Sequence, residues 1–286
     1  MTETRTALRR IFVVAGLAMA SCATAPEPQA KARKPQPSAD KAKVVPHDAK
    51  ALVDVAARVS QEKDGKGAVV VFDLDHTLFD NRTRTLQLLL QFASTLPPEK
   101  LDAATKIRAL SLPQVHYRLA DTLAEVKLKD PAVLEAAKRY WAERFFADEA
   151  VALDVPYTGA VEYVRELHKR GAFVVYLTGR ATEQMLVGST ESLRRWGFPI
   201  GVPGTQLIHK PVVDMEDVTF KEQAFVQIDR LGTVVAAFEN EPVNLLAMAK
   251  HWSDAIPVFL QTDFNPRNPS ELPKNARKLR DFSPPR

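Results

Sequence analysis

One short segment constrains the fold of this chain more than any other: the apolar run 68–72, which leads directly into Asp73 and Asp75. An uninterrupted apolar, β-branched run of this kind is typical of a strand buried on both faces, as in a parallel sheet. Two carboxylates at the end of such a strand are costly unless a cation compensates them, and Mg²⁺ prefers oxygen ligands. The segment therefore predicts a parallel sheet with a charged site at the carboxyl end of its first strand.

The rest of the chain alternates between strand-like and helix-like segments. Further apolar runs lie at 172–177, 206–209, 233–238 and 256–260. Helical periodicity is found at 51–63, 159–170, 182–196, 220–231 and 243–252. This alternation predicts an α/β fold, a three-layer Rossmann-like sandwich around a central, mainly parallel sheet.

Residues 82–153 interrupt the alternation. Their helical stretches are 85–96, 103–110, 114–126 and 132–146, with no convincing strand. We expect an all-helical cap inserted after the first strand, between the two core segments 51–81 and 154–266. Within the cap, Trp141, Phe145 and Phe146 have helical spacing, which favours packing in its core over a platform for a stacked substrate.

The two ends of the chain are predicted to lie outside this globular body. Arg5, Arg9 and Arg10 precede a ten-residue apolar run, about half of what a spanning helix needs, so residues 1–21 are typical of a secretory signal. Residues 22–50 are rich in Ala, Pro and Lys and predict a flexible tether. Residues 267–286 are basic and rich in Pro, and we expect them to lie along the surface.

The only cysteine, Cys22, ends a Met-Ala-Ser-Cys sequence that resembles a bacterial lipobox. The resemblance implies cleavage before Cys22 and a lipid anchor on its thiol, as the protein's only link to a membrane. Ala23 would then favour the outer membrane, on the periplasmic side of the cell envelope. The alternative is ordinary secretion after Ala20, with Cys22 as an incidental thiol.

The net charge of +4 suggests nucleic-acid binding until its position is considered. Residues 51–266 contain 24 Lys and Arg but 29 Asp and Glu, so the basic excess belongs to the ends of the chain. A mildly acidic body argues against a nucleic-acid partner. The oligomeric state is not predicted by the sequence.

The segment Asp73-Leu74-Asp75-His76-Thr77 resembles the DxDx[TV] motif of the haloacid dehalogenase superfamily of phosphatases. The resemblance implies that Asp73 is a nucleophile that forms an aspartyl-phosphate and that Asp75 is the general acid and base. It also implies Mg²⁺ as cofactor, bound by the carboxylate of Asp73 and the main-chain carbonyl of Asp75.

Two further motifs of this family have counterparts here. Thr178 and Gly179 follow the second strand, where the resemblance implies contacts with the phosphoryl group. Arg180 would either contact substrate or pair with an acidic neighbour. The family's phosphate-binding lysine is expected at Lys221, with Lys210 as the alternative.

The fourth motif departs from the family. Where family members carry Gly-Asp or Asp-Asp, this chain has Glu239-Asn240, so the resemblance implies that Glu239 and Asn240 complete the metal site. Since an amide is uncharged, Glu239 or Glu241 is expected to supply the carboxylate. Asp80 and Asn81 either line the entrance below the cap or cap its first helix.

These features predict an extracytoplasmic, lipid-anchored, Mg²⁺-dependent phosphomonoesterase that acts on small organophosphates or nucleotides. The alternative is a catalytically weak member of the same family, kept as a binding or scaffolding lipoprotein of the envelope. Asn240 is the residue that favours this alternative.

Overall fold

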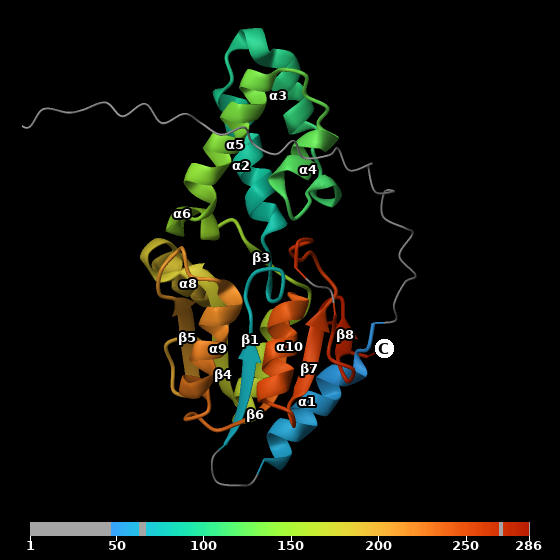
Figure 1. The fold of residues 1–286 in the computed structure, drawn as a ribbon, viewed down its shortest axis with the longest axis vertical. Helices are drawn as coiled ribbons and strands as arrows, with labels where there is room; N and C mark the ends of the chain where they lie inside the picture. The colour runs from blue at the N-terminus through green and yellow to red at the C-terminus, as the bar shows by residue number, and fades with distance from the viewer. Residues whose placement is uncertain (1–46, 63–66, 269–270, 286) are drawn as a thin grey trace, which may run out of the picture. The chain divides into compact units, whose positions relative to one another are not determined.

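The computed structural model describes residues 47–62, 67–268 and 271–285. In this part of the chain, a six-stranded sheet has the order β5-β4-β1-β6-β7-β8, and every neighbouring pair is parallel (Figure 1). Its strands are β1 (Ala68–Phe72), β4 (Phe173–Ala181), β5 (Thr205–Lys210), β6 (Thr233–Glu239), β7 (Ile256–Leu260) and β8 (Arg277–Leu279).

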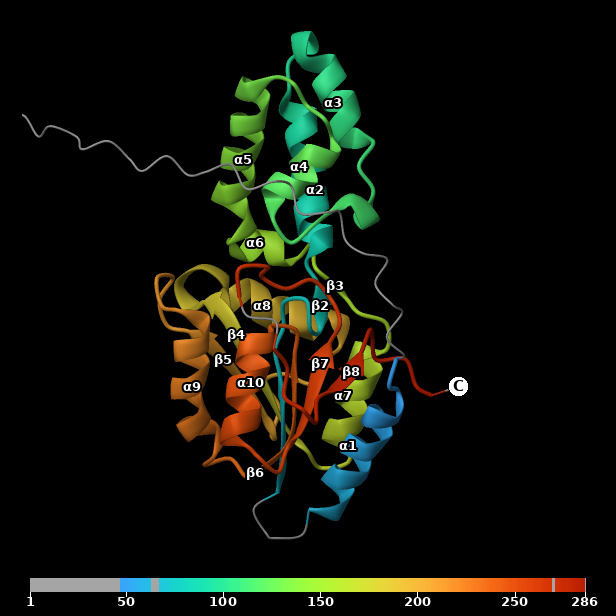
Figure 2. The ribbon, with the colours of Figure 1, turned by 45° about the vertical axis from the view of Figure 1, so that its right-hand side comes forward.

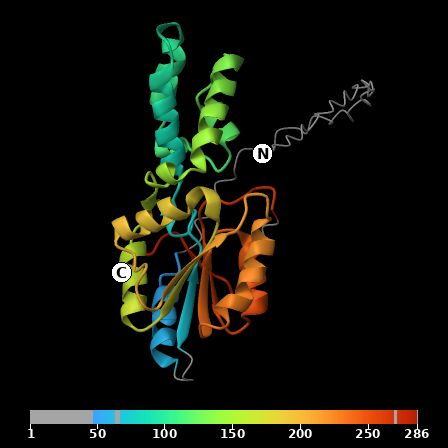
Figure 3. The same ribbon diagram turned by 90° about the vertical axis from the view of Figure 1, so that its left-hand side faces the viewer.

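Helices cover both faces of this sheet (Figure 3). Val70 and Phe72 of β1 pack in one apolar cluster, whereas Val69 and Val71 pack in another, because successive side chains of a strand point to opposite faces. The first cluster also includes residues of α1 (Lys50–Gln61), α7 (Ala160–Lys169) and α8 (Thr182–Trp196). The second includes residues of α9 (Asp217–Ile228) and α10 (Pro242–His251). The prediction of a three-layer α/β sandwich is confirmed.

The strand order brings the predicted motifs to one edge of the sheet. β1 lies between β4 and β6, and Phe72 is in register with Tyr176 of β4 and Phe238 of β6. The residues that follow these positions therefore emerge together at the carboxyl end. β4 is longer than predicted: it continues to Ala181, with a register shift after Thr178.

The regular elements of the inserted segment 82–153 are all helices (Figure 2). It leaves and rejoins the core through a two-stranded antiparallel stem, β2 (Phe79–Asp80) and β3 (Val155–Pro156). Its helices are α2 (Arg82–Thr95), α3 (Leu101–Arg108), α4 (Leu119–Glu125), α5 (Pro131–Phe145) and α6 (Asp148–Val151), with 3₁₀ turns at Pro98–Lys100 and Leu112–Gln114. Leu89, Phe92 and Ile107 are buried in a separate apolar cluster, so the cap has its own core.

The C-terminal segment differs from the prediction. Residues 277–279 form the edge strand β8, and Leu279 and Phe282 are buried in the core beside α1 and α7. The expectation that this segment lies along the surface is therefore wrong for these residues. This strand has three residues, of which only Leu279 is apolar. So short a segment shows no periodicity from which a strand could be predicted.

The predicted signal, the lipobox with Cys22 and most of the tether lie outside the described residues. Across residues 47–62, 67–268 and 271–285, no helix is both long and apolar enough to cross a membrane.

Candidate active site

A lysine between two carboxylates lies at the carboxyl end of β1. The Nζ of Lys221, from α9, is 2.7 Å from Oδ1 of Asp73 and 2.6 Å from Oε2 of Glu239. All three side chains are buried. The other oxygen of Glu239 accepts the N–H groups of Asn240 and Glu241, each at 2.9 Å. Glu239 is thus engaged with Lys221 and with the backbone of its own turn.

Burial and charge oppose each other in this cluster. Burial, together with the nearby charge of Glu239, raises the pKa of Asp73 to about 7 against the attraction of Lys221. Burial would lower the pKa of Lys221, but Asp73 and Glu239 outweigh it and raise that pKa. The lysine therefore stays charged, as a group that stabilises a phosphoryl anion must.

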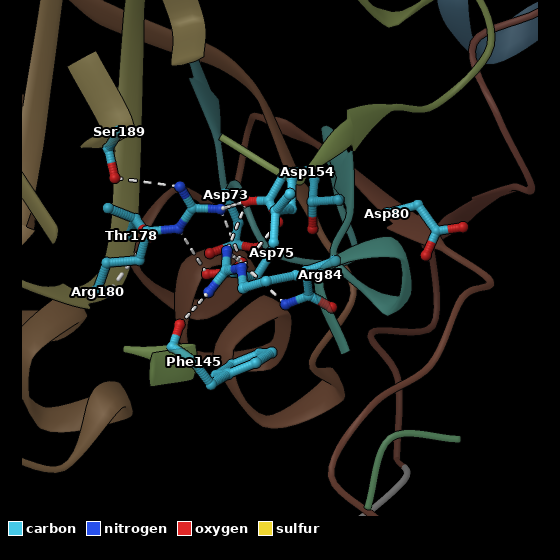
Figure 4. A network of polar contacts seen from close by, with 12 residues as sticks. Asp73, Asp75, Asp80, Arg84, Phe145, Asp154, Thr178, Arg180 and Ser189 are labelled. Atoms are coloured by element: carbon cyan, nitrogen blue, oxygen red, sulfur yellow. Dashed lines mark hydrogen bonds and ion pairs between the residues drawn. The ribbon is translucent and has the colours of Figure 1, made fainter. Parts of the chain in front are cut away.

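Asp75 is held by two arginines, which Figure 4 shows, and also by an amide. Arg180 donates to both of its oxygens, at 2.9 and 2.8 Å, and Nδ2 of Asn81 donates to Oδ1 at 2.9 Å. Arg84 approaches the same oxygen at 3.4 Å. Burial would raise the pKa of Asp75, but the guanidinium of Arg180, assisted by that of Arg84, holds it well below its usual range. Of the two roles considered for Arg180, this structure has it paired with acidic neighbours.

Asp154, a buried residue just before β3, ties the cap to the core. Its carboxylate accepts hydrogen bonds from Nε of Arg84 at 2.8 Å and from Nη2 of Arg180 at 2.7 Å. Arg84 belongs to α2 of the cap, and it also donates to the carbonyl of Phe145 at 3.0 Å. Neither Arg84 nor Asp154 was predicted from the sequence. In the sequence, each is a charged residue next to an apolar segment. Such residues are common, so this feature does not identify a site residue.

Two predicted residues at the stem have separate tasks. Asp80 accepts two hydrogen bonds from the guanidinium of Arg82, at 2.8 and 2.7 Å. Asn81 occupies the N-cap position of α2, but its side chain makes no capping hydrogen bond. Its amide instead reaches Asp75, so Asn81 lines the cavity described below.

The second motif, Thr178 and Gly179, belongs to β4, which neighbours β1 in the sheet. Thr178 is fully buried, and its hydroxyl oxygen accepts the N–H of Arg180 at 3.2 Å. Gly179 lines the cavity, and a Cβ there would lie 2.7 Å from Oδ2 of Asp217. Lys210 pairs with that same Asp217 at 2.7 Å. The structure thus brings Lys221, and not Lys210, to Asp73.

The side chains that could bind a cation in this site offer oxygen atoms, and few of them are charged. In the described part of the chain, no three His, Cys, Asp or Glu side chains are grouped so as to hold a metal. However, Asn244 has a buried Oδ1 with no hydrogen-bond partner among the described residues, and it lines the same cavity as Asp73 and Asn240. Carboxylate, carbonyl and amide oxygens are the ligands that Mg²⁺ accepts. The donor set therefore fits a hard divalent cation.

Glu241 lines the same cavity, but its carboxylate is already engaged by hydrogen bonds. Its two carboxylate oxygens accept hydrogen bonds from the N–H of Asn265 at 2.8 Å and the amide of Asn268 at 3.3 Å. Asn240 places its amide oxygen 3.2 Å from the hydroxyl of Thr77. Its amide nitrogen donates to the carbonyl of Asp263 at 2.7 Å.

A cavity of about 420 Å³ opens above these groups, between the core and the cap. Asp73, Asp75 and Lys221 line it from the core, and Trp141, Phe145 and Phe146 line it from the cap. The three rings are absent from the buried core of the cap, and Phe146 is 47% exposed. The prediction that they pack in the cap core is therefore wrong, because helical spacing cannot tell a core face from a face that borders a cavity.

No family model matches the chain, and no curated protein matches it. Among solved structures, the chain is similar to a subfamily IA hydrolase of the haloacid dehalogenase superfamily from Geobacter sulfurreducens. That match has 16% identity over 77% of this chain and 95% of the other, with a TM-score of 0.45.

Two further solved structures show comparable likeness. A class C acid phosphatase from Bacillus anthracis with bound tungstate is 14% identical over 72% of this chain and 67% of the other, with a TM-score of 0.39. A haloacid dehalogenase-like hydrolase from Streptococcus pneumoniae is 14% identical over 68% and 83%, with a TM-score of 0.39. Because one fold can support many chemistries, the function has to be argued from the residues of the site.

Proposed function

We propose that this chain is a phosphatase of the haloacid dehalogenase type, which hydrolyses small phosphomonoesters through an aspartyl-phosphate. The observation that carries the proposal is Asp73, a carboxylate at the end of β1 that borders the cavity with the ammonium of Lys221 at 2.7 Å. A carboxylate nucleophile beside a fixed cation is the arrangement that phosphoryl transfer to a side chain requires.

The reaction has two steps. In the first, a carboxylate oxygen of Asp73 forms a bond to phosphorus while the ester oxygen–phosphorus bond breaks, and the leaving oxygen takes a proton from the protonated form of Asp75. In the second, water attacks the aspartyl-phosphate, its proton passes to Asp75, and orthophosphate leaves as the Asp73 carboxylate is restored. Two displacements with lower barriers replace one difficult displacement.

Asp75 has the protonation state that suits the second step. The ion pair with Arg180 keeps its carboxylate charged, so it is ready to accept a proton from water. To protonate a leaving alcohol in the first step, Asp75 must first gain a proton against the pull of Arg180. We therefore expect the first step to favour leaving groups that are stable as anions.

We propose Mg²⁺ as cofactor, held by the Asp73 carboxylate, the Asp75 carbonyl and the amide oxygens of Asn240 and Asn244. When bound, the ion would neutralise charge on the phosphoryl group. Glu239 is not included in this set because Lys221 and two backbone N–H groups already engage its oxygens.

The decisive experiment is hydrolysis of p-nitrophenyl phosphate by the purified protein, with Mg²⁺ and with EDTA. We expect metal-dependent turnover in the wild type and none in Asp73→Asn. Asp121→Asn, which removes a cap carboxylate paired with Arg118, serves as the matched control. Absence of metal-dependent turnover, or equal rates for Asp73→Asn and the wild type, would sink the proposal.

The second candidate function is a catalytically weak binding or scaffolding lipoprotein. Asn240 favours it, because an amide replaces a carboxylate in the donor set and lowers the attraction for a cation. The same assay separates the candidates. A binding protein would retain phosphate or a phosphorylated ligand without turning it over, and Asp73→Asn would leave that binding in place.

We further propose that Cys22 is lipidated and anchors the protein to the cell envelope, with Ala23 directing it to the periplasmic side of the outer membrane. Support comes from the sequence, because these residues lie outside the described part. Cys22→Ser is expected to move the protein from the membrane to the soluble fraction, with Thr24→Ser as the control. If Cys22→Ser fractionates like the wild type, the protein is not lipidated at this residue.

A further inference from the structure

The cap side of the cavity is a wall of aromatic rings. Trp141 and Phe145 stack with their centroids 4.3 Å apart, and Phe146 meets Phe145 edge-on at 5.0 Å. All three line the cavity above Asp73, and Phe146 is 47% exposed. Apolar rings left partly uncovered inside a catalytic cavity indicate a surface that a ligand covers.

The wall is held in place by polar contacts. Nε1 of Trp141 donates to the hydroxyl of Thr85 at 3.1 Å. The guanidinium of Arg84 lies over the ring of Phe145, 4.5 Å from its centroid. Trp141 and Arg84 thus both lie against the ring of Phe145, whereas Phe146 is the most exposed of the three rings. A surface fixed in advance costs a ligand less ordering entropy when it binds.

The charges of the cavity limit the number of phosphates. Every lysine and arginine that lines it already has a carboxylate partner within hydrogen-bonding distance. The pairs are Arg82–Asp80, Arg84–Asp154, Arg180–Asp75, Lys210–Asp217 and Lys221–Asp73. One phosphoryl group is provided for at Asp73 and Lys221. A second phosphate would have to compete with the carboxylate partner of Arg82, Arg84, Arg180 or Lys210.

We propose that the preferred substrates are monophosphates whose leaving group carries a planar aromatic ring, stacked on Trp141 and Phe146. This inference rests on the proposed phosphatase function and names its substrate class. The ring can be a nucleobase or a simple aryl group, since every aromatic ring offers a π-face for stacking.

Two matched substrate pairs test the proposal on the full chain with Mg²⁺. Adenosine 5′-monophosphate and ribose 5-phosphate share the phosphorylated carbon and differ in the base. Benzyl phosphate and cyclohexylmethyl phosphate release alcohols of similar acidity and differ in the aromatic ring. We expect kcat/KM to be about tenfold or more higher for the aromatic member of at least one pair.

The variant Phe146→Leu should lower kcat/KM several-fold more for the aromatic member of a pair than for the non-aromatic member. Trp141→Leu should do likewise, and thermal melting checks that each variant is folded. Leu101→Ala, at an exposed position of α3, is the control for a change in the cap away from the cavity. Preference within the nucleoside pair alone identifies a nucleobase, and preference within the benzyl pair identifies an aryl group in general.

The assay distinguishes failure of the phosphatase function from failure of the aromatic preference. If no phosphomonoester is hydrolysed, the proposed function itself has failed. If both members of each pair are hydrolysed equally and Phe146→Leu changes neither, the function stands and the aromatic preference is overturned. A higher kcat/KM for adenosine diphosphate than for the monophosphate would contradict the limit to one phosphoryl group.

Discussion

Arg180 donates two hydrogen bonds to the carboxylate of Asp75, from Nε to Oδ2 at 2.9 Å and from Nη2 to Oδ1 at 2.8 Å. Such a bidentate pair is charge-assisted and directional, so it fixes both the protonation state and the orientation of the carboxylate. Asp75 is thereby prepared to accept a proton from water. The consequence can be seen in the kinetics of a single turnover.

Asp75→Asn should slow the second chemical step more than the first. With p-nitrophenyl phosphate, whose leaving group needs no proton, the variant should release a burst of p-nitrophenol close to one equivalent per site. Turnover should then fall by a factor of about 10² to 10⁴, the usual contribution of a general base. Stopped-flow absorbance measures both phases, and Asp73→Asn should show neither. Slow release without a burst in Asp75→Asn would contradict the role of Asp75 in hydrolysis of the intermediate.

Asp154→Asn should destabilise the protein strongly. The substitution keeps the shape of the side chain but leaves the buried guanidiniums of Arg84 and Arg180 with one carboxylate fewer. Breaking a buried ion pair in this way costs about 3–5 kcal/mol of unfolding free energy. Glu135→Gln, which breaks an exposed pair with Lys138, should cost less than about 1 kcal/mol. Urea denaturation measures the unfolding free energy of both variants. Equal losses would show that the buried ion pairs stabilise the protein no more than an exposed pair does.

The stability of the metal-free protein should depend on pH through Asp73. Burial raises its pKa to about 7, above the usual value of 3.8 that it regains on unfolding. Its contribution to the unfolding free energy is thus fully present below pH 3.8 and is lost as pH rises towards 7. Denaturation in EDTA across this range should show a decline that Asp73→Asn lacks. If the unfolding free energies of the wild type and Asp73→Asn changed in parallel with pH, Asp73 would not be the source of the decline.

The sequence was sufficient for the central strands because each of them carries its own apolar run. Residues 68–72, for example, are buried on both faces whatever the details of the surrounding packing. β8 has no such run. Leu279 becomes buried only because residues 277–279 pair with β7, and that contact depends on the rest of the fold. Local pattern therefore indicates the middle of the sheet better than its edge.

At the site, too, some residues have a recognisable local pattern and others do not. Asp73 could be predicted because it directly follows an apolar run, and Lys221 was expected from the resemblance to the family's motifs. The ion pair of Arg84 with Asp154 joins residues that are 70 positions apart, through the return of the cap to the core. Neither residue has a local pattern that distinguishes it from a solvated charge. Contacts of this kind become visible only when the two segments have been placed in space.

Phe282→Ala should be one of the most damaging changes in the C-terminal segment. Its ring lies among those of Tyr163, at 5.7 Å, and Phe238, at 5.7 Å, and its side chain is buried. Truncation of a buried phenylalanine costs about 3–5 kcal/mol. Lys274→Ala, at an exposed position of the same segment, should change stability by no more than about 0.5 kcal/mol. Thermal or urea unfolding tests this, and a loss under 1 kcal/mol for Phe282→Ala would mean that the segment is not part of the core.

Two glycines on either side of α7 separate backbone strain from close packing. Gly159 and Gly171 both have positive φ, +78° and +96°, so alanine at either position should cost about 1–2 kcal/mol for the left-handed backbone. At Gly171 a Cβ would meet nothing within 4 Å, whereas at Gly159 it would lie within 2.4 Å of the carbonyl oxygen of Phe282. That contact would also disturb the hydrogen bond from the N–H of Phe282 to the carbonyl of Thr158 at 2.9 Å. Gly159→Ala should therefore lose clearly more unfolding free energy than Gly171→Ala, and equal losses would show that residue 282 does not pack against this turn.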